Sequence, residues 1–210
     1  MMNEKNKDNN ESREKLIGCA KKEFLEKGFA KASLRKIAAD AGMTTGAVYF
    51  FFKDKDGLLG GVISEALDSL MKLLDKHFAE DTESDLSVYQ QQDGDHDEFA
   101  EELVNVIYDN FDEMTILLDR SAGSKYGGIV EQIIAKLDYT YITMAERYAA
   151  VMPGKHANKV MLHWLTHVQV DAFIHMMNHF TDRQEAMRFI KPVMDYLIKG
   201  WITYALEDDT

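Results

Sequence analysis

The sequence predicts an all-α protein in which a small N-terminal helical domain is joined through a long helix to a larger helical domain. Apolar residues recur at intervals of three and four along most of the chain, which is the spacing of an amphipathic helix. Only two prolines interrupt the 210 residues, and no segment shows the convincing alternation that is typical of a strand. We expect helices over residues 12–27, 34–41, 44–51, 54–79, 98–120, 125–152, 156–180 and 183–206.

Composition and charge limit the classes of function. Cys19 is the single cysteine, so a disulfide within the chain is excluded and a reducing cytoplasm is the expected location. No apolar run approaches the length of a membrane span, so no membrane partner is expected. The net charge is −12, yet residues 1–60 carry +3 and residues 61–210 carry −15. A weakly basic first third allows an anionic partner at that end, although a chance fluctuation explains the charge equally well.

Start and stop signals frame the first helix. Ser12 is a suitable N-cap, an apolar stripe follows, and Gly28 is suited to ending the helix. The polar residues 1–11 contain no apolar run, and we expect a disordered tail there.

The next two helices are short and closely spaced. Ser33 is placed to cap the first helix, Gly42 to end it and Thr44 to cap the second. A turn of three or four residues containing glycine between two such helices is typical of the helix-turn-helix motif. Residues 12–56 are therefore predicted to form a helix-turn-helix domain, and residues 57–210 a second helical domain.

The stretch TTGAVYFFFKDKD sets four aromatic residues directly before four alternating charges. Val48 and Phe52 are four residues apart and face the same side of a helix, which suits a small core. The two aromatic residues that follow Val48 lie on other sides. Lys53 and Lys55 stand at the start of the next helix, where ammonium groups and free backbone N–H donors suit phosphates.

The residues from FLEKGFAKASL through IAADAGMTTGAVYFFFKDKDGLL resemble the DNA-binding domain of the TetR family of bacterial transcriptional regulators. The resemblance covers about fifty residues with fixed spacing. The positions that match the family pattern are Ile37, Ala38, Ala41, Gly42, Thr44, Gly46, Tyr49, Phe52, Lys55 and Leu58.

The resemblance implies a role in DNA binding for the residues around the second short helix. Thr44 would cap this recognition helix and contact a phosphate, while Thr45, Gly46 and Ala47 would face the major groove. The hydroxyl of Tyr49 and the ammonium of the lysine that opens the next helix would bind phosphates. The full predicted set of DNA-facing residues is Ser33, Thr44, Thr45, Gly46, Ala47, Tyr49, Phe50, Lys53 and Lys55.

One position departs from the family pattern. Phe51 stands where the family often has His or Tyr, and its ring cannot donate a hydrogen bond. Either one phosphate contact is missing, which is our working hypothesis, or Phe51 packs against the sugar backbone. Thr45 and Ala47 are too small for the Arg–guanine or Asn–adenine pairs of strong base readout, so methyl contacts and DNA shape are expected to contribute.

The resemblance also implies that the larger domain forms a dimer and encloses an effector pocket. Residues 156–180 and 183–206 support the dimer independently, because both helices carry wide apolar faces. The predicted interface comprises Val168, Met176, Ile190, Met194, Leu197 and Trp201. The predicted pocket comprises Tyr108, Tyr141, Met144, Trp164 and His167. Residues 80–97 are acidic and polar, and we expect a mobile loop there.

Four histidines, His163, His167, His175 and His179, stand at four-residue intervals, with Asp171 between the two pairs. The first two have the spacing of metal-binding helices. Each step turns about 40° around a helix, so the four cannot converge on one site. Polar positions at a pocket rim or dimer seam are the simpler interpretation, and no metal or cofactor is predicted.

These features predict a sequence-specific DNA-binding transcriptional regulator. An enzyme is not expected, because no nucleophile elbow, phosphate loop or HExxH motif occurs. The resemblance implies a repressor that leaves pseudo-palindromic operator DNA when a small molecule binds the C-terminal domain of a homodimer. The alternative is a protein of the same fold that is controlled by a protein partner through residues 80–97.

Overall fold

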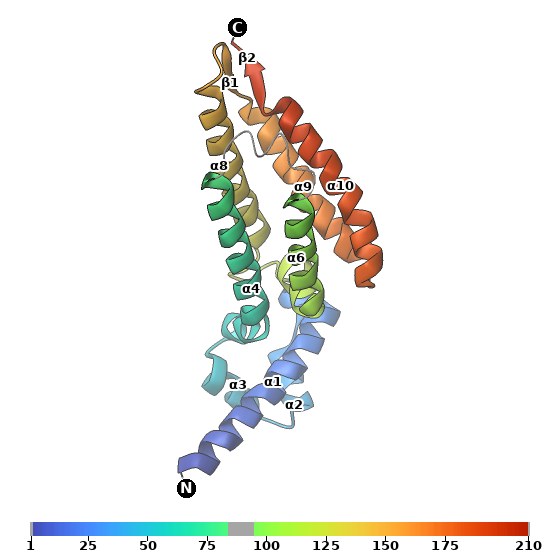
Figure 1. Cartoon of the computed structure of the whole chain (residues 1–210). Coiled ribbons are helices and arrows are strands. Elements are labelled where there is room, and N and C mark those ends of the chain that lie inside the picture. The colour runs from blue at the N-terminus through green and yellow to red at the C-terminus, as the bar shows by residue number, and fades with distance from the viewer. Residues whose placement is uncertain (1, 84–94, 210) are drawn as a thin grey trace. The chain divides into compact units, whose positions relative to one another are not determined.

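The computed structural model of the chain describes residues 2–83 and 95–209, and helices account for most of them (Figure 1). The all-α prediction is confirmed. The helices are α1 (Met2–Lys31), α2 (Leu34–Asp40), α3 (Thr45–Phe52), α4 (Lys55–Glu83), α6 (Asp95–Asp109), α7 (Phe111–Thr115), the π-helix η1 (Ile116–Arg120), α8 (Ile129–Ala149), α9 (Lys159–His179) and α10 (Arg183–Tyr204). Two short strands, β1 (Lys155–Ala157) and β2 (Leu206–Asp208), complete the described elements.

The chain divides into two compact units that do not follow the order of the sequence. Unit 1 comprises Met1–Ser69 and Asn110–Ile129, and unit 2 comprises Leu70–Asp109 and Val130–Thr210. The second part of unit 1, Asn110–Ile129, is called the returning segment below. The predicted organisation had a single domain boundary after residue 56. It does not include the return of the chain to unit 1 at Asn110–Ile129.

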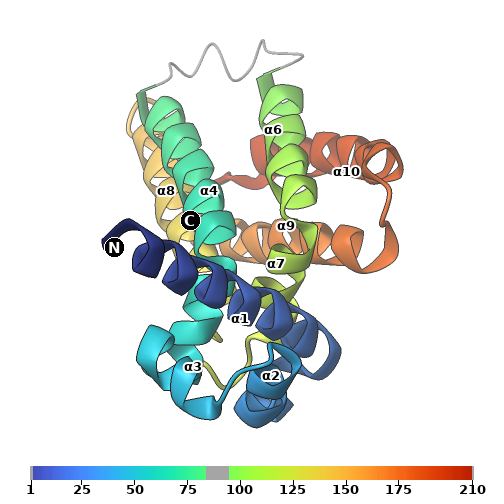
Figure 2. The same ribbon diagram turned by 90° about the horizontal axis from the view of Figure 1, so that it is seen from below.

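Unit 1 is built around a core that α1, α2, α3 and the first turns of α4 share, and Figure 2 shows the first three grouped together. The buried core positions recur at helical spacing: Leu16, Ala20, Phe24, Ile37, Ala38, Val48, Phe52, Leu58 and Leu59. The predicted end of the first helix at Gly28 appears as a bend, because Gly28 has a φ of 70° and ψ of 163°, a backbone conformation that favours glycine.

Polar contacts fasten the returning segment to the rest of unit 1. The ammonium of Lys21 on α1 lies 2.8 Å from Glu113 and 3.3 Å from Asp112, both on α7. The carboxylate of Asp56 accepts a hydrogen bond of 2.7 Å from the backbone N–H of Lys125. These contacts join residues that are about 70 to 90 positions apart in the chain.

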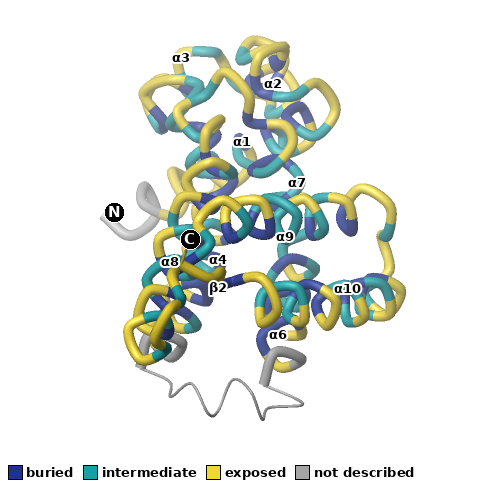
Figure 3. Tube along the Cα trace, turned by 90° about the horizontal axis from the view of Figure 1, so that it is seen from above, coloured by how far each residue is buried: buried dark blue, intermediate teal, exposed yellow. Residues whose placement is uncertain are grey.

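Unit 2 is a helical bundle that consists of α6, α8, α9, α10 and the second half of α4 (Figure 1). Helix α10 packs against both α9 and α6. Strands β1 and β2 pair antiparallel, with His156 opposite Glu207. Figure 3 shows that buried residues line the inner faces of these helices, while exposed residues occupy their outer faces.

Several element boundaries differ from the predicted ones for local reasons. Residues 2–11, which were expected to form a disordered tail, are helical, and α1 starts at Met2 and not at Ser12. These residues contain no proline or glycine to stop helix propagation outward. The helix expected over residues 98–120 is divided at Asn110, whose φ of −130° and ψ of 39° are not helical.

The remaining differences concern loops and strands. The ends of the loop expected over residues 80–97 are helical, since α4 continues to Glu83 and α6 begins at Asp95. Residues 84–94 lie outside the described part of the chain, and so does most of that prediction. No strand was predicted, but β1, which precedes α9, pairs with β2, which follows α10.

Candidate DNA-binding surface and interior cavity

Helices α2 and α3 form a helix-turn-helix, and the predicted residues stand at the start and end of α2 and at the start of α3. Ser33 caps α2, because its hydroxyl accepts a hydrogen bond from the backbone N–H of Lys36. Gly42 turns the chain after α2 with a φ of 69°. Thr44 stands at the N-cap of α3 as predicted, but its side chain makes no capping hydrogen bond.

A buried carboxylate locks α2 against α1. Glu23 on α1 is only 3% exposed, and it accepts hydrogen bonds from the backbone N–H of Ser33 at 3.2 Å and from the ammonium of Lys36 at 2.8 Å. The Lys36 hydrogen bond lowers the pKa of the Glu23 carboxyl. The first helix therefore holds the cap of the second through an ionised group, and no pattern in the sequence predicted this contact.

The outer face of α3 presents small and aromatic side chains to solvent. Val48 and Phe52 are buried as predicted. Tyr49 is 55% exposed and Phe50 is 75% exposed, so two large rings lie on the surface at the end of the recognition helix. Of the smaller predicted contacts, Thr44 and Gly46 are exposed, while Thr45 and Ala47 are half-buried.

The two lysines predicted to meet phosphates have different environments. Lys53 is exposed and has a φ of 74°, which is rare for a residue with a side chain. Lys55 is half-buried: its ammonium lies 4.7 Å from the centre of the Phe29 ring and donates to the carbonyl of Ala30 at 3.4 Å. Burial lowers the pKa of Lys55. Lys53 is therefore the better placed of the two for a phosphate.

Phe51 packs among aromatic neighbours. Its ring meets that of Phe50 edge to face, with centroids 4.9 Å apart, and lies 6.3 Å from the ring of Phe52. It is half-buried. The ring thus supports the exposed Phe50 and offers no hydrogen-bond donor.

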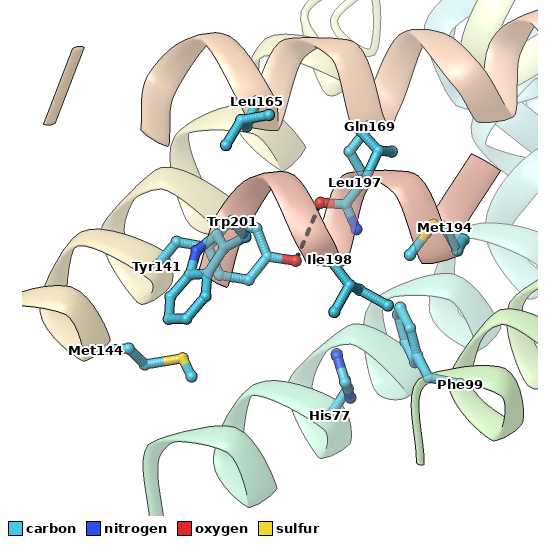
Figure 4. Close-up of a pocket in the computed structure, with 10 residues that line it drawn as sticks. All are labelled: His77, Phe99, Tyr141, Met144, Leu165, Gln169, Met194, Leu197, Ile198 and Trp201. Atoms are coloured by element: carbon cyan, nitrogen blue, oxygen red, sulfur yellow. Dashed lines mark hydrogen bonds between the residues drawn. The ribbon is translucent and has the colours of Figure 1, made fainter. Parts of the chain in front are cut away.

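Unit 2 contains a cavity of about 60 Å³ on which all five of its long helices converge (Figure 4). The described residues that line it are His77 of α4, Phe99 of α6, Tyr141 and Met144 of α8, Leu165 and Gln169 of α9, and Met194, Leu197, Ile198 and Trp201 of α10. The Tyr141 hydroxyl donates a hydrogen bond of 3.0 Å to the amide oxygen of Gln169.

Two of the five residues predicted for a pocket, Tyr141 and Met144, lie on the wall of this cavity. The other three lie elsewhere. The hydroxyl of Tyr108 donates to the carbonyl of Phe180, Trp164 is 54% exposed, and the ring of His167 meets that of His163 at 4.6 Å.

Two polar cavity residues, His77 and Gln169, were not predicted, although each interrupts an apolar stripe in the sequence. His77 continues the apolar stripe of Leu70, Leu73 and Leu74 at helical spacing. Gln169 likewise falls on the inward stripe of α9. A polar residue on an apolar stripe indicates a position in the core that apolar side chains alone do not fill.

Four of the six residues predicted for a dimer interface are covered by their own chain. Met176, Ile190, Met194 and Leu197 are buried in unit 2, because the strongest apolar stripe of each helix faces the bundle. Trp201 lines the cavity. Val168 differs, since it follows the exposed Val160 and Trp164 at four-residue spacing on the outer face of α9.

The histidines of α9 form two separate pairs. His163 and His167 meet edge to face, whereas His175 and His179 stack at 3.9 Å. His163 also bonds the carboxylate of Asp138 on α8 at 2.5 Å. Within residues 2–83 and 95–209, no cluster of three or more metal-ligating side chains is placed to hold an ion. In the same part of the chain, no helix combines the length and apolar character that crossing a membrane requires.

Known proteins match both the helix-turn-helix segment and the fold. Residues 16–62 match the family described as bacterial regulatory proteins, tetR family. The transcriptional repressor BepR of Brucella suis biovar 1 is 41% identical over 56 residues, which are 27% of this chain and 27% of BepR. The regulator TtgR of Pseudomonas putida is 37% identical over 75 residues, which are 36% of this chain and 33% of TtgR. The matches thus span about a third or less of these relatives.

The similarity in fold extends over most of the chain. A crystal structure of a TetR-like transcriptional regulator from Rhodococcus sp. RHA1 has a TM-score of 0.61 and 15% sequence identity, and the alignment covers 91% of this chain and 96% of that one. Residues 16–62 are thus similar to the tetR family of bacterial regulatory proteins, and the fold of the chain is similar to that of a TetR-like regulator.

Proposed function

We propose that this chain is a sequence-specific DNA-binding transcriptional regulator, and that it is a repressor released from its operator by a small molecule. The observation that supports this most directly is α3, an eight-residue helix that follows the Gly42 turn and exposes Tyr49 and Phe50. A helix presented in this way fits the major groove of DNA. BepR, one of the matched relatives, is a transcriptional repressor, which favours repression over activation.

Two copies of the chain would bind one pseudo-palindromic operator. Recognition helices in a twofold dimer meet half-sites about 34–36 Å apart. The outer stripe of α9, formed by Val160, Trp164 and Val168, offers apolar surface for the second copy. Burial of such a stripe against its twofold mate would form an isologous contact.

The cavity of unit 2 is the proposed effector site. A ligand changes DNA affinity only if it binds one conformation of the protein better than the other. Release from DNA therefore requires that the liganded cavity favour a conformation whose two recognition helices no longer fit the half-sites. Linkage then requires that operator DNA weaken ligand binding by the same factor.

Fluorescence anisotropy with the DNA upstream of the gene for this chain, compared with a scrambled duplex across a salt series, tests the first part. We expect selective binding of one dimer per site, with a log–log salt slope of about −0.9 for each phosphate contacted. Equally weak binding to both duplexes would contradict an operator at that location. Absence of binding to any DNA at low salt would contradict the DNA-binding function itself.

A further inference from the structure

The cavity of unit 2 is poor in charge. Among the described residues that line it, none is Lys, Arg, Asp or Glu. His77 contributes an imidazole ring to this lining. A charged ligand bound here would give up part of its hydration with no Lys, Arg, Asp or Glu side chain in this lining to compensate, which is unfavourable.

Aromatic rings form two walls of the cavity (Figure 4). His77 and Phe99, from α4 and α6, stack with centroids 3.6 Å apart and planes 9° from parallel. Tyr141 and Trp201, from α8 and α10, meet at 64° with centroids 6.3 Å apart. Faces and edges of rings attract a further aromatic ring beyond the simple burial of its area.

The size of the cavity limits the ligand. An apolar cavity of roughly 150 Å³ accommodates benzene, so a space of about 60 Å³ accepts one ring only after some side chains move. Met144 and Met194 line the space, and the flexible thioether chain is the kind that adapts most readily. Fused ring systems would require the helices themselves to separate.

One polar group gives the cavity direction. The amide oxygen of Gln169 accepts the hydrogen bond from Tyr141, which orients the amide. The amide nitrogen supplies the donors of this group, and it lies on the other side of the amide (Figure 4). An oxygen on the ligand would be a suitable acceptor.

From this geometry we infer that the cavity takes an uncharged ligand with one aromatic ring and one hydrogen-bonding oxygen, as in a simple phenol. The ring lies between the His77–Phe99 pair and the Tyr141–Trp201 pair, and its oxygen accepts from Gln169. The inference rests on the proposed function, in which this cavity is the effector site.

The two tryptophans of the chain allow a direct binding test. Replacing the exposed Trp164 (Trp164→Phe) leaves Trp201 on the cavity wall as the single tryptophan of the full-length protein. Its fluorescence is titrated with four compounds of similar size: p-cresol, toluene, 4-methylcyclohexanol and 4-methylbenzoate. No DNA is needed, so this result is independent of operator binding.

We expect p-cresol to saturate the Trp201 signal at one molecule per chain. Toluene lacks the oxygen and 4-methylcyclohexanol lacks the aromatic ring, and each should bind about 3- to 10-fold more weakly. The anionic 4-methylbenzoate should bind at least about 10-fold more weakly than p-cresol. Equal or tighter binding of 4-methylbenzoate would overturn the uncharged class, and equal binding of 4-methylcyclohexanol would overturn the aromatic class. Absence of saturation by every compound would overturn the site.

A Gln169→Leu change in the same background tests the oxygen contact. It should reduce p-cresol affinity to that of toluene and leave toluene binding unchanged, whereas Gln184→Leu at the exposed start of α10 should change neither. An equal loss for both ligands would show that Gln169 only maintains the shape of the cavity. If p-cresol saturates Trp201 but leaves the complex with operator DNA intact, the ligand class stands and the proposed release mechanism fails.

Discussion

Among single residues, Tyr49 offers the cleanest test of a phosphate contact. Its ring is 55% exposed on α3, and Tyr49→Phe removes the hydroxyl while keeping the ring. We expect operator binding to weaken by about 1 kcal/mol, roughly fivefold, because one hydrogen bond is lost. Fluorescence anisotropy at fixed salt measures this. Tyr139→Phe on α8, where the tyrosine is 76% exposed, is the matched control and should leave affinity unchanged.

Lys53 combines a backbone conformation that strains the fold with a charge suited to DNA. Its φ of 74° and ψ of −46° lie in a sparsely populated region of backbone conformation, which costs a residue with a Cβ about 1–3 kcal/mol. Lys53→Gly should therefore raise the free energy of unfolding by about 1 kcal/mol, as measured by urea denaturation, whereas Lys53→Ala should not. Both variants lose the ammonium, so both should reduce the salt slope of DNA binding by about 0.9. A glycine variant no more stable than the alanine variant would contradict the strain.

A substitution at the neighbouring Phe51 tests whether a phosphate contact is missing at this position. Phe51→His replaces a ring without a donor by one with an N–H, and we expect affinity for operator DNA to rise severalfold, since one charge-assisted hydrogen bond to phosphate becomes available. Unchanged affinity at fixed salt would favour the alternative in which Phe51 packs against the sugar backbone.

Local signals made part of the surface predictable and left part of it hidden. Ser33 and Gly42 act through their own backbone neighbours, so the sequence alone was sufficient to locate them. The environment of Lys55 depends on Phe29 and Ala30, which are about 25 residues earlier in the chain. No pattern near Lys55 reports that contact, and a charge that looks available in sequence is partly engaged in the fold.

At the level of helices, the junction between α1 and α2 depends on an ionised carboxyl. The hydrogen bond from Lys36 lowers the pKa of Glu23 below its ordinary value of 4.5. The ionised Glu23 carboxylate therefore contributes its full stabilisation of the fold above about pH 4.5. This stabilisation is lost as the pH falls through the lower pKa of the folded state. Glu23→Gln should lower the free energy of unfolding at pH 7 by about 1–3 kcal/mol, and this difference should shrink as the pH falls through the folded-state pKa of Glu23.

Chemical denaturation of Glu23→Gln across this pH range measures the effect. Glu26→Gln is the control, because Glu26 is on the same helix with its side chain 62% exposed. Equal losses in both variants, or a Glu23→Gln deficit that persists at low pH, would contradict the role of the ionised carboxyl.

Whole elements were predictable where the residues that define a helix lie within or directly beside it in the sequence. Helix α2 combines an apolar stripe with a capping serine and a glycine that ends it, and α3 begins directly after a threonine in the N-cap position. Strands β1 and β2 lack such local signals, because each has three residues and each exists only through the other, about 50 positions away. The stripes of α9 and α10 were visible, but a stripe does not specify whether its own chain or a second copy covers it. In unit 2 the chain itself covers Met176 and Ile190 completely.

For the molecule as a whole, the proposed dimer is testable at the outer face of α9. Trp164→Glu would bury an unpaired carboxylate in the interface, so we expect dimer affinity to fall by about 3 kcal/mol, roughly 100-fold. Light scattering after size-exclusion chromatography measures the oligomeric state. Phe50→Glu is the control, since it changes an exposed apolar residue of unit 1. It should weaken DNA binding and leave the dimer intact; a Trp164→Glu protein that stays dimeric would place the interface elsewhere.

The divided make-up of unit 1 has a consequence for synthesis on the ribosome. When Ser69 has been added, the unit still lacks the returning segment, which is complete only about 60 residues later, at Ile129. At a translation rate of about 5–20 residues per second, that interval lasts about 3 to 12 s. During it Lys21 has no Glu113 to bind and Asp56 has no Lys125. The nascent unit 1 therefore finishes folding only after part of unit 2 has been synthesised, so a shortened chain ending at residue 69 would be open to proteases that spare the full-length protein.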